Sequence, residues 1–467
     1  MQNLKILIVW GLCLLLFSVN NRPVQSQDTL SINLTEFIEK GLANSGQVAY
    51  ESGKVDLAQN RINEARSQRI LPRFDLNTQH GVIPGVETDV PGLGDGELYL
   101  DPDLSNDWDN WAIFTRAELT ATQPIFTWGA LSSAVQAAEA GARAAQYEFS
   151  AVKAEAELQL FDLYYSYLLA VEISRILEDA DEKLDLVQDT IDEMREEGNP
   201  DLQESDVFKF QIFKSEFVTR RTEVEESLDY VKRVWNYALQ AEPGVTYIPD
   251  SNFLDPVPYE LEDYAYYRQI ALGERPEMLG VEYGITALKN RLEAEKARQY
   301  PLLFLGITGS FAHTPNRPRQ TNPFIRNTTN YGSVGVGFGI RQNLNIFSMR
   351  ASVEKAKIEY KRVNDLQKAV SDRIILDLNE RYREAVVAET RMKQTEEALV
   401  TARKWERNEQ LNYDIGFGDV ENLLDAVQKE LELRVKLKQN IFDLNKKIAA
   451  LHKAGGLPIS QLNLDSN

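Results

Sequence analysis

Residues 131–152 read LSSAVQAAEAGARAAQYEFSAV, and the spacing of their apolar side chains decides the class of fold. These side chains recur at intervals of four and three residues, at Leu131, Val135, Ala138, Ala142, Ala145, Phe149 and Val152. A heptad period of this kind predicts a helix whose seam of small residues packs in a coiled coil. No proline interrupts residues 131–198. The pattern therefore predicts one helix over that range, roughly 100 Å long.

The same reasoning extends to most of the chain. Further helices are predicted over residues 34–70, 202–240, 261–299, 348–415 and 420–453. Arg275-Pro276 should interrupt one of them, because proline cannot continue a helix from the preceding turn. Turns that contain Gly198 and Gly416 join each long helix to an antiparallel partner. The predicted fold class is therefore mainly α.

The sequence contains an internal duplication. Ala58, Ala65 and Arg69 recur at the same spacing around Pro301, and Ile125-Phe126-Thr127 recurs as Ile346-Phe347-Ser348. Repetition of this length indicates two related structural repeats. The predicted segments are a signal peptide over residues 1–26, a first repeat over 27–242, a linker over 243–258, a second repeat over 259–457 and a C-terminal tail over 458–467.

The N-terminal residues favour export from the cytoplasm. Lys5 precedes an apolar run that ends at Val19, and Ser26 lies at a plausible cleavage site, which is typical of a secretory signal peptide. The run is too short for a membrane helix, which needs about 20 residues. Cys13, the only cysteine, lies inside it, so we expect no disulfide in the mature chain. The net charge of -20 argues against nucleic acid as a partner.

Four short segments alternate between apolar and polar or glycine residues. Phe74 and Leu76 alternate with polar neighbours, and Val334 to Arg341 alternates with glycine. Apolar residues outside and polar residues inside are typical of a membrane barrel, although an ordinary half-buried sheet has the same pattern. The residues expected to face the lumen are Asp75, Asn77, Gln79, Arg116, Glu118 and Arg341. Four strands cannot close a barrel, which needs about eight, so several copies would be required.

Several short motifs occur in a characteristic order along the chain. They are Leu71-Pro72, Gln123-Pro124-Ile125-Phe126 with Trp128-Gly129, Arg275-Pro276-Glu277, Tyr300-Pro301, Tyr413-Asp414-Ile415-Gly416 and Leu423-Leu424-Asp425-Ala426. In this order, with the duplication, the sequence resembles the TolC-like outer-membrane factors, or outer membrane efflux proteins, over about residues 28–457. The resemblance implies a homotrimer whose twelve strands, four per chain, form one transmembrane β-barrel. It also implies a long coiled-coil α-helical barrel in the periplasm.

The resemblance further implies a passive channel-tunnel in the bacterial outer membrane, surrounded by its lipid. Such a channel exports small molecules or proteins as part of a tripartite efflux pump or a type I secretion system. Its partners would be a periplasmic adaptor (membrane fusion) protein and an inner-membrane pump or ABC transporter. We expect no enzyme activity and no cofactor, since no catalytic or phosphate-binding pattern stands out. A secreted coiled-coil scaffold or adaptor of the periplasm is the alternative.

Two candidate sites lie at the turns between paired helices. The resemblance places the adaptor-contact tips at Gly198, Asp201, Leu202, Gly416, Phe417, Gly418 and Asp419. These residues also suit turns that only end helices. Asp419, Glu421 and Asp425 would form an acidic constriction in a trimer, attracting cations, or would simply complement a helix dipole.

Two segments and three histidines complete the candidate residues. Residues 81–110 contain acids but no Lys or Arg, whereas residues 313–330 contain Arg317, Arg319 and Arg326 but no acid. We interpret both as outer loops and hypothesise that they attract each other electrostatically. The acidic segment lacks the glycine and glutamate of a calcium-binding EF-hand loop. His80, His313 and His452 lack metal-ligand spacing, and we expect them at the surface.

Overall fold

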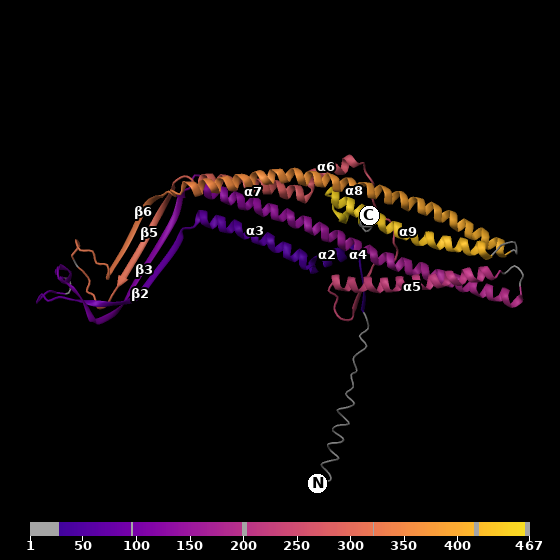
Figure 1. The fold of residues 1–467 in the computed structure, drawn as a ribbon, viewed down its shortest axis with the longest axis horizontal. Helices are drawn as coiled ribbons and strands as arrows, with labels where there is room; N and C mark the ends of the chain where they lie inside the picture. The colour runs from indigo at the N-terminus through magenta and orange to yellow at the C-terminus, as the bar shows by residue number, and fades with distance from the viewer. Residues whose placement is uncertain (1–27, 95–96, 199–202, 321, 415–419, 463–467) are drawn as a thin grey trace, which may run out of the picture. The chain divides into compact units, whose positions relative to one another are not determined.

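The computed structural model describes residues 28–94, 97–198, 203–320, 322–414 and 420–462 (Figure 1). Within them the chain forms two compact units, and each unit combines segments from both predicted repeats. Unit 1 contains residues 28–50, Ala151–Arg275 and residues 374–462, and unit 2 contains Glu51–Ser150 and Pro276–Arg373. The predicted signal peptide lies outside the described residues.

The long helices agree closely with the sequence prediction (Figure 1). They are α4 (Ala130–Glu197), α5 (Glu204–Ala238), α8 (Ile346–Asp414) and α9 (Val420–Gly455). The predicted interruption is also confirmed, since α6 (Tyr264–Glu274) ends two residues before Pro276, which begins α7 (Pro276–Ala297).

The single helix predicted over residues 34–70 is wrong. Two helices occupy this range, α2 (Leu34–Asn44) and α3 (Gly46–Ile70). Ser45 lies between them with extended backbone, and its Oγ accepts a hydrogen bond from the Val48 amide at 3.3 Å. A serine at this position caps the N-terminus of the second helix, so it separates the two elements.

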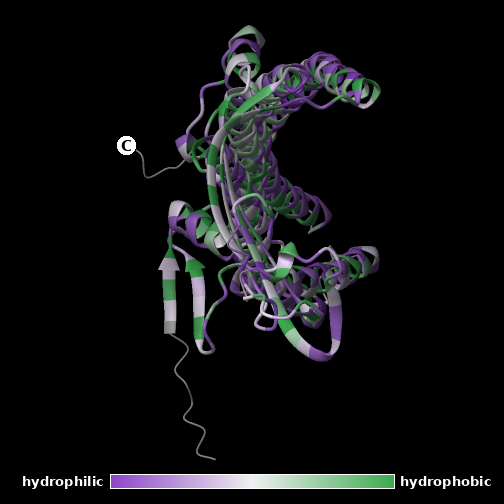
Figure 2. Cartoon of the chain, turned by 90° about the vertical axis from the view of Figure 1, so that its left-hand side faces the viewer, coloured by the Kyte–Doolittle hydropathy of each residue, from purple (hydrophilic) through white to green (hydrophobic). Residues whose placement is uncertain are grey.

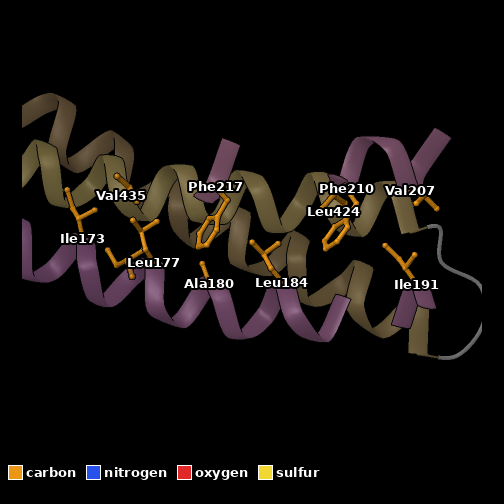
Figure 3. Close-up of a cluster of buried hydrophobic side chains, with 11 residues drawn as sticks. Ile173, Leu177, Ala180, Leu184, Ile191, Val207, Phe210, Phe217, Leu424 and Val435 are labelled. Atoms are coloured by element: carbon orange, nitrogen blue, oxygen red, sulfur yellow. The ribbon is translucent and has the colours of Figure 1, made fainter. Parts of the chain in front are cut away.

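In unit 1, parts of α4, α5 and α9 pack around a continuous apolar cluster. Figure 3 shows that the side chains from α4 point toward those from the other two helices. The cluster contains Ile173, Ile176, Leu177, Ala180, Leu184, Ile191, Val207, Phe210, Phe217, Leu424 and Val435. Nearly complete burial of these side chains stabilises the arrangement, at roughly 25 cal/mol per Å² of apolar surface removed from water.

A second core of unit 1 surrounds Trp235 of α5. The Trp235 ring is fully buried, its centroid lies 4.2 Å from that of Phe37, and its Nε1 donates to the Leu163 carbonyl at 3.1 Å. Nearby, β1 (Asp28–Ile32) and β4 (Val245–Pro249) form a parallel two-stranded sheet.

The predicted linker over residues 243–258 is therefore not simply an extended connection. It contains β4, and beyond that strand its backbone is held by buried side chains of the helices. The Leu254 amide donates to Glu172 Oε1 at 3.1 Å, and the Val257 amide donates to Asn445 Oδ1 at 2.9 Å. Proline content indicated the lack of helix but could not indicate these contacts.

Unit 2 contains the predicted four-stranded sheet. Its strands are β2 (Arg73–Glu87), β3 (Ser105–Phe126), β5 (Leu302–His313) and β6 (Tyr331–Arg341). All neighbours are antiparallel, in the order β2-β3-β5-β6. The prediction that residues 81–110 form a loop is wrong in part, because β2 continues to Glu87 and β3 begins at Ser105. The hydrogen bonds of a β-hairpin join backbone atoms and do not depend on side-chain charge. The acidic composition of residues 81–110 therefore suggested a loop where the strands in fact continue.

The heptad seam is confirmed in unit 2. Ala58 and Ile62 of α3 pack against Ala142 of α4, with Ala138 and Ala145 at the edge of the cluster. Small side chains on both helices allow the backbones to approach closely.

Candidate functional site

The strand register places the predicted lumen residues on one face of the sheet. Asn77 of β2 pairs with Glu118 of β3, and Gln79 pairs with Arg116. Glu118 in turn pairs with Ser310 of β5, which pairs with Ser333 of β6. Directly opposed residues of antiparallel strands project to the same face. By the same alternation Asp75 and Arg341 belong to this polar face, which also carries glycines.

The opposite face of the sheet is apolar and exposed. Val334, Val336, Phe338 and Ile340 of β6 have exposed fractions of 81%, 68%, 76% and 75%. Phe74, Leu76, Val82 and Ile113 on β2 and β3 are similarly exposed. The strands change hydropathy from residue to residue (Figure 2). A contiguous apolar surface of this kind marks a site of contact with another protein or with lipid.

Among the described residues, no helix is both long and apolar enough to cross a membrane.

Near one end of the polar face, an aromatic ring requires a glycine opposite it. Phe304 of β5 pairs with Gly339 of β6, and a Cβ at Gly339 would lie 2.5 Å from the Phe304 ring. The Arg341 guanidinium lies 5.0 Å from the centroid of the same ring, a cation–π distance. Around Gly335 and Gly337 the space is open. Gly339 is therefore a packing position, whereas the other two leave the polar face without side chains.

The segment 313–330 contacts the acidic segment, but its acceptors are neutral. Arg317 donates from Nε to the Pro84 carbonyl at 2.9 Å and from Nη2 to Asn106 Oδ1 at 3.0 Å. Asn316 Nδ2 donates to the Ile83 carbonyl at 3.3 Å. None of the ion pairs among the described residues joins the two segments. The contact seen in the structure consists of hydrogen bonds that the sequence could not reveal, and the electrostatic attraction between the segments stays a hypothesis.

Only one of the predicted tip residues can be placed. Gly198 follows α4 with a φ of 64°, the left-handed conformation usual for a glycine that ends a helix. Asp201, Leu202, Gly416, Phe417, Gly418 and Asp419 lie outside the described residues. The structure thus leaves the adaptor-contact residues as a prediction.

The acids at the start of α9 differ in their surroundings. Glu421 forms an ion pair with Lys209 of α5, and this hydrogen bond raises the pKa of Lys209. Asp425 is exposed. The positive charge of Lys209 offsets part of the negative charge of Glu421. The sequence could not predict this ion pair, because the two residues are far apart in the chain. The charge of Asp425 also acts on Lys209, so both described acids lie near this lysine, and the acidic constriction stays a prediction.

The histidines divide into two kinds. His80 and His313 are exposed, as predicted, and both pair with Thr115 in the sheet register. The prediction of a surface position is wrong for His452, whose exposed fraction is 9%. Burial lowers the pKa of this imidazole, partly opposed by a hydrogen bond to the Pro458 backbone. A helix of mixed composition does not reveal from its sequence which polar residue the neighbouring elements will cover.

Comparison with known proteins identifies the fold. Neither protein-family models nor curated proteins match the sequence. Among solved structures, CusC has a TM-score of 0.70 at 14% identity, with 95% of this chain and 96% of that chain covered. The CmeC outer membrane channel of Campylobacter jejuni has a TM-score of 0.67 at 14% identity, covering 92% and 87%. The MtrE outer membrane channel of Neisseria gonorrhoeae has a TM-score of 0.67 at 13% identity, covering 91% and 89%.

These similarities extend over nearly the whole of each protein. Because the sequence identity is only 13–14%, these similarities establish the fold alone. The chain has the fold of bacterial outer-membrane channels, and the resemblance to TolC-like outer-membrane factors predicted from its sequence is confirmed at that level.

Proposed function

We propose that this protein is a passive outer-membrane channel that takes part in export. The observation that carries the proposal is the sheet of unit 2, which has one exposed apolar face and one polar, glycine-rich face. Lipid is the environment in which an exposed apolar sheet face is stable, and water would wet the polar face. The fold shared with outer-membrane channels supports this assignment.

The proposed channel is a homotrimer. The sheet contributes four strands, and in the described part of the chain neither β2 nor β6 pairs with a further strand at its outer edge. Exposed edges are unstable in a membrane, because lipid supplies no hydrogen-bond partners for the backbone. Three copies would close these edges in a twelve-stranded barrel, which exceeds the minimum of about eight strands.

The long helices would cross the periplasm and bring the channel to its partners. α4 and α8 contain 68 and 69 residues, enough for a helix of roughly 100 Å. We propose that the turns at Gly198 and Gly416 contact a periplasmic adaptor protein, which links the channel to an inner-membrane pump or ABC transporter. Asp419, Glu421 and Asp425 would then line an acidic constriction that favours cations. Energy for export would come from the pump.

Cysteine substitution at two neighbouring residues of β3 tests the orientation of the sheet. Glu118 lies on the polar face and Leu119 on the apolar face. The only natural cysteine, Cys13, lies in the predicted signal peptide, so an introduced thiol would be unique. We expect a charged, water-soluble thiol reagent to reduce the conductance of Glu118→Cys channels in planar bilayers. Leu119→Cys, the matched control, should conduct unchanged.

The native mass of the protein extracted from outer membranes tests the assembly. Three chains per detergent particle, together with the expected thiol response, would support the trimeric channel. A monomer found only in the soluble periplasmic fraction would contradict it and favour the coiled-coil scaffold. Equal responses of Glu118→Cys and Leu119→Cys would contradict the assigned lumen face.

A further inference from the structure

A hollow of about 440 Å³ lies on the polar face of the sheet, beside the segment 313–330. Its lining side chains come from β2, β3 and β5 and from that segment, and they include Gln79, Trp108, Phe114, Arg116 and Arg317. Pockets that bind small molecules have volumes of about 300–1,000 Å³, so the space suits a ligand of that size. We call this feature the arginine hollow.

Arg116 of β3 supplies the first positive charge of the arginine hollow. It pairs with Gln79 of β2 and with Ala312 of β5, so it belongs to the polar face. Its side chain is exposed, and within the described parts of the chain no hydrogen bond or ion pair engages it. Glu118 follows on the same face but does not line the hollow. The planar guanidinium of Arg116 is therefore available to a carboxylate, whose geometry it matches.

Arg317 supplies the second positive charge and is held in position by the strands. Its Nε donates to the Pro84 carbonyl at 2.9 Å, and its Nη2 donates to Asn106 Oδ1 at 3.0 Å. A guanidinium has further N–H groups beyond the two used here, and these can donate to a ligand. Because the two bonds already order this side chain, a ligand would bind it at a lower cost in conformational entropy.

The ring of Phe114 supplies an apolar surface beside Arg116. Phe114 pairs with Gly81 of β2, and a Cβ at Gly81 would lie 2.5 Å from the ring. A glycine opposite the ring therefore leaves the space in which Phe114 lies on the polar face. Since residues two apart on a strand project to the same side, Phe114 and Arg116 present a ring and a charge next to each other.

Trp108 reaches the arginine hollow from a bulge of β3. Adjacent residues of β2 pair with Asp107 and with Trp111, so residues 108–110 have no partner on β2. Bulges of this kind redirect side chains. The Trp111 Nε1 donates to the Trp108 carbonyl at 2.6 Å, which supports the bulge. Trp108 lines the hollow and is still 64% exposed, so its indole has free surface for a ligand.

The arginine hollow is positive within an acidic chain. The net charge is -20, and residues 81–110 alone contain eight acids. None of the described residues that line the hollow is an acid. A bound anion would therefore meet two guanidinium groups and no lining carboxylate that repels it.

We propose that the arginine hollow binds aromatic carboxylates and that such compounds are cargo of the channel, a role that rests on the proposed function. Arg116 and Arg317 would bind the carboxylate, while Trp108 and Phe114 would contact the ring of the ligand. A simple anion would leave the two aromatic surfaces unused. A neutral aromatic compound would leave Arg116 without a partner.

Isothermal titration calorimetry of the full-length protein in detergent tests the site. The ligand is 2-naphthoate, and the comparison ligands are naphthalene-2-methanol, which lacks the charge, and acetate, which lacks the ring. Heats measured with detergent alone are subtracted. We expect 2-naphthoate to bind at least about tenfold more tightly than either comparison ligand, because only it uses both the charged and the aromatic groups. Equal affinity of 2-naphthoate and either comparison ligand would overturn the proposed ligand class.

Variants of the lining residues locate the binding. Arg116→Gln should weaken 2-naphthoate binding about tenfold, the loss of one charge-assisted hydrogen bond. Arg341→Gln is the matched control, since Arg341 lies beside the Phe304 ring on the same face but does not line the hollow. Trp108→Leu should weaken binding about three- to tenfold, and Trp108→Phe, which keeps a ring, should restore part of that loss.

Two results with these variants would overturn the site. Unchanged affinity in Arg116→Gln or in Trp108→Leu would show that the ligand binds elsewhere. Equal losses in Arg116→Gln and Arg341→Gln would show a general attraction of anions to the polar face instead of a site in the hollow.

Conductance in planar bilayers separates this inference from the function on which it rests. Saturating 2-naphthoate should reduce the conductance of the wild type and leave that of Arg116→Gln unchanged. If the channel conducts and Glu118→Cys responds to the thiol reagent, but 2-naphthoate does not bind, the hollow is wrong as a site and the channel stands. Binding without channel formation would overturn the proposed function and the cargo role together, and leave the site. Binding without an effect on conductance would overturn the cargo role alone.

Discussion

The helix cluster of unit 1 and the apolar face of the sheet in unit 2 have similar side chains and opposite environments. Leu184 and Phe210 of the cluster are almost completely buried by the chain itself. Val336 and Phe338 of the sheet are mostly exposed. The hydrophobic effect acts equally on both sets, since it depends on apolar area rather than on position in the sequence. The side chains of the cluster are therefore buried within one chain. The apolar side chains of the sheet face would be removed from water only by contact with lipid or with another protein.

This difference defines what each region contributes. The buried cluster fixes the geometry of the helices that approach the two turns, and it should be insensitive to lipid. In the proposed channel, lipid covers the apolar face of the sheet, so mutations on that face should have effects that depend on the lipid environment.

The largest expected effect is the loss of a ring from the helix cluster. Phe217→Ala should destabilise unit 1 by about 3–5 kcal/mol, because a large cavity remains where the ring was removed. Denaturant unfolding in detergent and in vesicles should give the same loss. Val218→Ala, at the neighbouring exposed position, is the control and should cost less than about 0.5 kcal/mol. Equal effects of the two substitutions would remove the contrast between buried and exposed positions.

A charge on the apolar sheet face should have the next largest effect, but only in a membrane. Val336→Arg should destabilise the membrane-inserted protein by about 2–4 kcal/mol, the cost of an arginine near the bilayer midplane. Gly335→Arg places the same charge on the polar face, where the Cβ has open space, and should be tolerated. Outer-membrane yield and unfolding in vesicles would measure both. Tolerance of Val336→Arg would show that lipid does not cover this face.

The polar face provides a smaller test of packing within the sheet. Gly339→Val should cost about 1–3 kcal/mol, because the new side chain overlaps the Phe304 ring. Gly337→Val is the control, since nothing lies within 4 Å of a Cβ there. Combining Gly339→Val with Phe304→Ala should recover part of the stability. If the ring simply moves aside, the two single glycine variants will unfold at the same denaturant concentration.

The smallest expected effect is a pH dependence from the buried histidine of unit 1. Burial lowers the pKa of His452 in the folded protein, so below about pH 6.5 the unfolded chain binds the proton more readily. The stability contribution is present above that pH and is lost as the pH falls through the lowered folded pKa. We expect the Tm of the wild type relative to His452→Gln to decrease from pH 8 to pH 5, with exposed His313→Gln measured beside it. A constant difference would mean that His452 does not titrate during unfolding.

Much of this architecture could be predicted from local patterns. The heptad seam around Ala142, the break at Pro276 and the alternation along β6 are signals in which neighbouring residues carry the information. That the residues proposed to line the lumen share one face of the sheet was predictable for the same reason, since a strand has period two. The break at Ser45 was missed, because a single serine is a weak signal until its side chain is seen to cap a helix.

The remaining features depend on residues that are far apart in sequence. Lys209 meets Glu421, and Arg317 meets Pro84, only because the helices and strands bring them together. The helix and strand periods of the sequence contain no information about such distant pairs. His452 shows the same limit for burial, since its covering groups belong to other segments.

The sequence by itself determined the helices, the alternating strands, the duplication and the two chemically different faces that each strand presents. Only the tertiary structure decided the strand order β2-β3-β5-β6, the pairing of β1 with β4 and the bulge that carries Trp108. The physical reason is one of range. Helix and strand periods result from backbone geometry within a few residues, whereas register and burial result from the free energy of contacts between distant parts of the chain.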